Sequence, residues 1–180
     1  MRQTAIARRY AGALFEVAKS EDAVDRVESD LGLITFSLEN TPRLREVMVH
    51  PLIPAARKKE IAAEVFDGRV QEVTLHFLDL VIDKRREGIL EEVEPEYVQL
   101  ANEFRNLVPV MVTSAVPLTA DEQSALRKKL EKFTGKMVEL QLAEDPELIG
   151  GLVVQIGDTV IDGSVRGYLA SLREKLLGRQ

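Results

Sequence analysis

The chain has 180 residues, a formal net charge of −6 and a sequence pI near 5.1. This acidic balance disfavours general binding to nucleic acids or to anionic lipid, both of which need a basic surface. The chain contains no cysteine, which excludes disulfides and thiol chemistry. Its apolar runs are too short to cross a bilayer. We therefore expect a cytoplasmic protein with a core large enough for one or two domains.

Apolar residues recur at alternating spacings of three and four through roughly the first hundred residues, which is the pattern of amphipathic helices. Pro95 lies early in the last of these runs, where it is expected to kink the helix or delay its start. We predict six helices within residues 1–106, forming an all-helical domain. The clearest run consists of Val24, Val27, Leu31, Ile34 and Leu38.

The pattern changes near Pro109. The β-branched, alternating segment Pro109–Pro117 predicts a strand. Thr119 and Glu122 have the spacing of a capping box, which predicts a helix that ends at Gly135. Alternating apolar residues over 138–142 then predict a half-buried strand. With the elements that follow, we expect an α+β protein, in which the six-helix bundle precedes a small β-α-β-β-β-α domain over residues 107–180.

The segment 145–169 is the most distinctive part of the chain, and we call it the signature segment. Gly157-Asp158 predicts a two-residue hairpin turn of type II′, because glycine takes a positive φ without steric cost. Either Asp162 or Ser164 can cap the helix that follows. Gly150-Gly151 lacks the pattern of a phosphate-binding loop and indicates a bulge or a close backbone approach. Arg166 can hold either the hairpin or a carboxylate of a partner.

The sequence shows no nucleophile–base pair and no metal-ligand spacing. His50 and His76 are isolated, and turn or cap roles explain Asp158 and Asp162 more simply than acid catalysis. We expect no cofactor. Two other classes of function are a small enzyme with its site in the C-terminal domain, and an RNA-binding module. The missing motifs count against the first, and the acidic charge and absent aromatic strand motif count against the second.

Two helices have more apolar surface than one bundle contact needs. At about 100° per residue, the apolar arc of the first helix covers roughly half its circumference, and the helix over 70–84 is similar. Two interpretations are open: both helices are buried on two sides, which the pattern alone favours, or they form a groove for a foreign amphipathic helix. The residues concerned are Ile6, Tyr10, Ala13, Leu14 and Val17 in the first helix, and Phe77, Leu80 and Val81 in the second.

The signature segment resembles a known family. Its residues 160–167, Val-Ile-Asp-Gly-Ser-Val-Arg-Gly, are similar to the C-terminal motif of the delta subunit of bacterial F-type ATP synthase, the counterpart of the mitochondrial oligomycin-sensitivity-conferring protein. Residues 6–15 resemble the first helix of that family. The resemblance implies a non-catalytic stator subunit of the peripheral stalk. Such a subunit links the F1 catalytic ring to the b subunits of the membrane F0 sector and resists torque during proton-driven ATP synthesis.

The resemblance also implies partners and sites. The helical domain, residues 1–106, would bind the N-terminal helix of a ring α subunit between its first and fifth helices. The contact would use the eight apolar residues named above for the first helix and for the helix over 70–84. The domain over 107–180 would bind the C-terminal end of the b (or b/b′) subunits. Neither nucleic acid, metal nor direct membrane insertion is implied, and the protein is expected at the cytoplasmic face of the cell membrane as a peripheral part of the complex. The residues expected to contact b are Leu148, Ile149, Leu152, Val154, Ile156, Val165, Leu169 and Leu172. The expected turn and cap residues are Gly150, Gly151, Gly157, Asp158, Asp162, Gly163 and Arg166.

Overall fold

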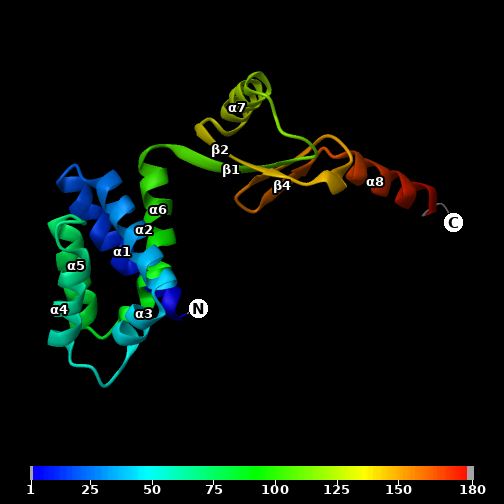
Figure 1. Cartoon of the computed structure of the whole chain (residues 1–180). Coiled ribbons are helices and arrows are strands. Elements are labelled where there is room, and N and C mark those ends of the chain that lie inside the picture. Colours follow the sequence, from blue (N-terminus) through cyan, green and yellow to red (C-terminus); the bar gives the residue numbers. More distant parts are fainter. Residues whose placement is uncertain (1, 178–180) are drawn as a thin grey trace. The chain divides into compact units, whose positions relative to one another are not determined.

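The computed structural model describes residues 2–177, which divide into two compact units after Phe104. The first unit is helical, and the second combines a sheet with helices (Figure 1), so the α+β class predicted from the sequence is confirmed. The helices of the first unit are α1 (Arg2–Ser20), α2 (Val24–Asn40), α3 (Pro42–Val49), α4 (Ala55–Phe66), α5 (Glu72–Asp83) and α6 (Leu90–Phe104). The second unit contains β1 (Leu107–Ser114), α7 (Ala120–Thr134), β2 (Met137–Glu144), β3 (Leu152–Ile156), β4 (Thr159–Asp162) and α8 (Val165–Leu177).

Small residues let α1 pack closely on the rest of the helical unit. Ala7, Ala11 and Ala18 are completely buried on one side of α1. Phe15, on the same helix, stacks edge-to-face on Tyr97 and on Phe104 of α6, with ring centroids 5.9 Å apart in both pairs. Such aromatic pairs stabilise the fold by about 0.5–1.5 kcal/mol beyond the contribution of the apolar area they bury. The contacts hold α1 and α6 together and leave another side of α1 to face α5.

A carboxylate of α2 fixes the start of α5. The helix α5 follows Gln71, whose side chain does not cap it. Instead, Asp30 of α2 accepts hydrogen bonds from the backbone N–H of Gln71 and from the hydroxyl of Thr74, both at 2.7 Å. Asp30 and Thr74 are buried. The negative carboxylate also lies at the positive end of the α5 dipole, which favours this position.

Pro95 lies inside α6 without delaying it. The short 3₁₀ helix η1 (Glu87–Ile89) leads directly into α6 at Leu90. The expectation of a delayed helix start is therefore wrong. Proline cannot donate to the carbonyl of Glu91, and Pro95 lies on an exposed part of α6.

The sheet of the second unit is mixed, with strand order β2-β1-β3-β4. β1 pairs in parallel with β2 through the α7 crossover, whereas β1–β3 and β3–β4 are antiparallel. The strand expected over Pro109–Pro117 occupies Leu107–Ser114 instead. Pro109 lies near the start of β1, where it pairs with Glu139 of β2 but has no partner in β3, because pairing with β3 begins only at Val110. The β3 side of Pro109 is therefore an edge, a position in which proline is tolerated.

One face of this sheet forms a small core against α7. Leu130 of α7 packs with buried side chains from three strands: Val110, Val112, Val138 and Val154. The predicted capping box of α7 is confirmed, because Thr119 Oγ1 accepts from the N–H of Glu122 at 3.4 Å and the Glu122 carboxylate accepts from the N–H of Thr119 at 2.8 Å. Gly135 ends the helix with φ +70°, as predicted.

Candidate functional site

A groove of about 520 Å³ lies on the helical unit between α1 and α5. Tyr10 and Phe77 meet across it with ring centroids 6.3 Å apart and planes at 73°. Leu14 and Phe77 are nearly buried, whereas Val17 and Leu80 are 44% and 46% exposed. A partner that covers these side chains would gain about 25 cal/mol of binding free energy for each Å² of apolar surface removed from water. The lining residues are Tyr10, Ala13, Leu14, Val17 and Glu21 on one side, and Glu72, Val73, His76, Phe77 and Leu80 on the other.

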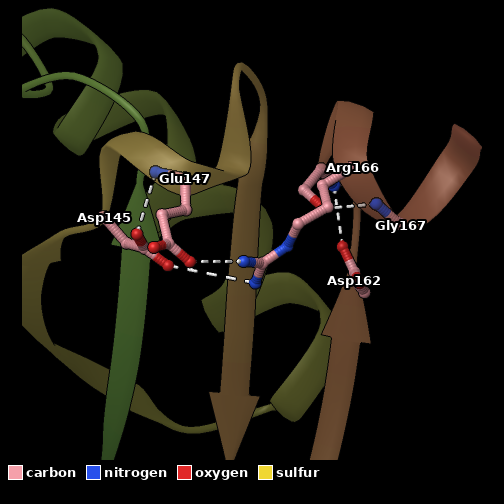
Figure 2. A network of polar contacts seen from close by, with 6 residues as sticks. Asp145, Glu147, Asp162, Arg166 and Gly167 are labelled. Carbon is pink, nitrogen blue, oxygen red and sulfur yellow. Dashed lines mark hydrogen bonds and ion pairs between the residues drawn. The ribbon is translucent and has the colours of Figure 1, made fainter. Parts of the chain in front are cut away.

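In the second unit, the signature segment ties the start of α8 to a short 3₁₀ helix, η2 (Pro146–Leu148). Figure 2 shows the guanidinium of Arg166 pointing at two carboxylates, 3.3 Å from Glu147 and 3.9 Å from Asp145. Asp145 also accepts from the backbone N–H of Glu147 at 2.9 Å. The contacts of Arg166 are internal, but they reach η2 and the residue before it rather than the hairpin that was expected; a contact between Arg166 and a partner's carboxylate stays a prediction. These ion pairs are exposed and contribute about 0–1 kcal/mol each.

Both candidate capping residues take part in starting α8. Asp162 Oδ1 accepts from the backbone N–H of Ser164 at 2.8 Å, and Ser164 Oγ accepts from the N–H of Gly167 at 2.9 Å (Figure 2). Ser164 is therefore the N-cap, and Asp162 forms the turn before it. Hydrogen bonds from Ser164, first from its hydroxyl and then from its backbone N–H, lower the pKa of Asp162, and the charge of Arg166 adds to this.

The glycines of the signature segment allow close backbone contacts. Gly151 has φ +75°, and a Cβ there would overlap the carbonyl oxygen of Gly163. The close approach expected of Gly150-Gly151 is confirmed, although both residues lie before β3 rather than within a strand. Gly157 has φ +56°, whereas the φ of Asp158 is negative, so the hairpin turn fits the predicted type II′.

The outer side of α8 is apolar and exposed. Val165, Tyr168, Leu169 and Leu172 are spaced by three, one and three residues and are 41%, 69%, 51% and 42% exposed. Residues at i, i+3, i+4 and i+7 share one helix face. Ile149, beside η2, is 68% exposed. We call these five residues the α8 face.

A family model described as ATP synthase delta (OSCP) subunit matches residues 6–176. The chain belongs to this family. Among its relatives, the ATP synthase subunit delta of Syntrophomonas wolfei is 40% identical over 98% of this chain and 97% of that protein. The subunit delta of Symbiobacterium thermophilum is 42% identical over 100% of this chain and 97% of the relative. The chain is accordingly a non-catalytic stator subunit of F-type ATP synthase.

The fold agrees with this assignment. A chain in the cryo-EM structure of the Toxoplasma gondii mitochondrial ATP synthase hexamer superposes with a TM-score of 0.62 at 23% identity, over 95% of this chain and 97% of that chain. Within residues 2–177, no helix is long and apolar enough to cross a membrane. The same residues contain no group of three or more potential metal ligands.

Most of the family-implied residues of the helical unit line the groove, and two do not. Val81 is completely buried in the bundle core, and Ile6 is half-buried against it. Neither therefore lines the groove, and Val81 offers no surface to a partner. Six residues do line it: Tyr10, Ala13, Leu14, Val17, Phe77 and Leu80. The remaining lining residues, which are not among the eight expected contacts, are Glu21, Glu72, Val73 and His76.

The residues expected to contact b divide by burial. Leu148 and Val154 are 2% and 4% exposed, so their side chains belong to the interior of the second unit and are not available to a partner. Leu152 and Ile156 are half-buried beside the sheet core. The exposed members are Ile149, Val165, Leu169 and Leu172, all of which belong to the α8 face.

Proposed function

We propose that the α1–α5 groove receives the N-terminal helix of an α subunit of the catalytic ring, and that the α8 face binds the C-terminal end of the b subunits. In this arrangement the two units join the ring to the peripheral stalk at the cytoplasmic face of the membrane. Family membership supplies the complex, and the groove is the observation on which the ring contact rests.

The groove favours a helix as its occupant. Its walls are two helices, whose backbone N–H and C=O groups are already paired along α1 and α5. An extended peptide would find no strand edge there to pair with. An amphipathic helix needs only an apolar stripe, which can pack between Val17 and Leu80 and over Leu14 and Phe77.

The α8 face is suited to a second helical contact. Four of its apolar residues, all except Ile149, lie on one stripe of α8, the arrangement that packs against the seam of a neighbouring helix or coiled coil. Ser164 caps α8 and Arg166 ties its first turn to η2, so the start of the α8 face has a fixed position in the second unit. A contact that transmits torque requires such a fixed attachment.

Apolar packing suits a stator better than surface charge does. Exposed ion pairs contribute about 0–1 kcal/mol each and weaken with salt, whereas a buried leucine or phenylalanine contributes about 1.5–3 kcal/mol. Two contacts in one chain also raise the effective affinity, because binding at one site holds the second site near its partner.

Titration calorimetry with a synthetic peptide of the host's α-subunit N-terminus tests the ring contact. We expect one-to-one binding that Val17→Glu and Leu80→Glu each weaken about tenfold or more, because a carboxylate would be covered without a partner. Phe36→Glu is the matched control, since Phe36 is 63% exposed on α2 and lies outside the groove. Equal binding by the groove variants and the wild type would overturn the proposal.

A further inference from the structure

The groove has an acidic end. Glu21 directly follows α1, and Glu72 is the first residue of α5. Asp30 of α2 holds the start of α5, and α2 begins just after α1 ends. The start of α5 therefore lies towards the end of α1, which places both glutamates at the same end of the groove. The other lining residues are apolar, apart from His76.

The two carboxylates are not neutralised by a lysine or arginine within the described part of the chain. The side chain of Glu72 is 87% exposed, and its nearest cationic candidate is His76, with 3.9 Å between Nε2 and Oε1. Glu21 is exposed and forms no ion pair among residues 2–177. At neutral pH, two negative charges therefore stand at one end of an otherwise apolar groove.

We propose that the docked helix places a positively charged end against Glu21 and Glu72. This inference rests on the proposed function of the groove. The charge can come from a lysine or arginine side chain, or from the free α-amino group at the N-terminus of the helix, which is largely protonated at neutral pH because its pKa is about 7.7–8.0. In either case the acidic end fixes the direction in which the helix lies. The apolar stripe supplies most of the binding affinity, and the carboxylates determine the direction of the docked helix.

The first test compares affinities at two salt concentrations. The Glu21→Gln/Glu72→Gln double variant keeps the size of both side chains, and Glu39→Gln, on an exposed part of α2 outside the groove, is the control. For two exposed charge contacts we expect the α-subunit peptide to bind the double variant about three- to tenfold more weakly at 50 mM salt. The salt dependence seen with the wild type and the control should largely disappear.

An acetylated peptide separates the two sources of positive charge. If the free terminal amine contributes, acetylation reduces the difference between the wild type and the double variant. If a basic side chain is responsible, acetylation leaves the difference unchanged, and replacing that residue by glutamine removes it. Both results support the proposal that a positively charged end of the helix lies against Glu21 and Glu72. A difference that survives acetylation and replacement of every lysine and arginine in the peptide would overturn the proposal.

The direction of the docked helix gives an independent readout. Because the chain has no cysteine, a nitroxide can be attached through Ser20→Cys at the acidic end or Ala5→Cys at the other end of α1. We expect the label at position 20 to broaden NMR signals from the positive end of the peptide, and the label at position 5 to broaden those from the opposite end. The reverse pattern would overturn the inference.

Failure of this inference is distinguishable from failure of the proposed function. If the wild-type protein is folded but does not bind the peptide, both are wrong. If the wild type binds, Leu80→Glu weakens binding about tenfold or more, and the glutamine double variant binds as tightly as the wild type at both salt concentrations, only the charge assignment is wrong.

Discussion

The carbonyl oxygen of Gly163 lies in the space that a Cβ on Gly151 would occupy. These residues flank the β3–β4 hairpin, so their approach brings the start of β3 and the start of α8 together. Two backbone hydrogen bonds secure the contact, from the N–H of Gly163 to Leu152 at 3.0 Å and from the N–H of Val165 to Gly150 at 2.9 Å. The glycines of the signature segment therefore have a structural role at the start of α8.

Gly151→Ala should destabilise the second unit by about 2–4 kcal/mol, because alanine at φ +75° is strained and its methyl group also meets backbone. Gly135→Ala is the matched control, since Gly135 has φ +70° with open space around it and should cost only about 1–2 kcal/mol. Urea denaturation measures both. Equal losses would mean that the overlap with Gly163 relaxes without cost.

A buried ion pair joins α4 to η1. The ammonium of Lys58 lies 2.7 Å from the carboxylate of Glu87, and both side chains are more than nine-tenths buried. Lys58→Met should lower the free energy of unfolding by about 3–5 kcal/mol, because it leaves a buried carboxylate unpaired. The Lys58→Met/Glu87→Leu double variant should recover most of that loss. A cost below about 1 kcal/mol for Lys58→Met would contradict the burial of the pair.

Asp30→Ala should both destabilise the helical unit and weaken the groove. Its carboxylate satisfies the N–H of Gln71 and the hydroxyl of Thr74, so its loss should cost about 1–3 kcal/mol. Because Asp30 positions the start of α5, affinity for the α-subunit peptide should fall as well. Thr74→Val removes one of the two hydrogen bonds and serves as the smaller step. Unchanged stability on Asp30→Ala would show that this carboxylate does not hold α5.

The second unit should lose stability in acid partly through Asp162. Its folded-state pKa lies below its unfolded value, because Ser164 hydrogen-bonds to the charged form. The contribution is complete above the unfolded pKa of about 3.9 and is lost as the pH falls through the lower folded pKa. Asp162→Asn should therefore be less stable than the wild type at pH 6, with a difference that shrinks by pH 2.5. Urea midpoints across this range measure the effect, and a constant difference would count against it.

Local patterns were enough to predict elements whose cause is local. The capping box of Thr119 and Glu122 and the helix end at Gly135 depend on residues a few positions apart, and both are confirmed. Periodicity also identified α1 as unusually apolar. It could not separate the sides of that helix: Ala7 and Ala18 face the bundle, whereas Ala13 and Val17 line the groove.

Contacts between distant residues had no signal in the sequence. Asp30 meets Thr74, and Lys58 meets Glu87, only because the fold brings separate helices together. The acidic end of the groove was missed for the same reason, since Glu21 and Glu72 each look like an ordinary exposed residue near a helix end. Burial was equally hidden: Leu148 and Ile149 are adjacent and both apolar, yet one is 2% and the other 68% exposed.

The most direct test of a two-sided joint is a crossed titration with the α-subunit N-terminal peptide and a C-terminal fragment of the b subunits. Leu80→Glu alters the groove, and Leu169→Glu alters the α8 face. We expect each variant to lose its own ligand by about tenfold or more and to bind the other ligand as the wild type does. If Leu80→Glu still binds the α peptide tightly, or Leu169→Glu still binds the b fragment tightly, the corresponding half of the joint lies elsewhere.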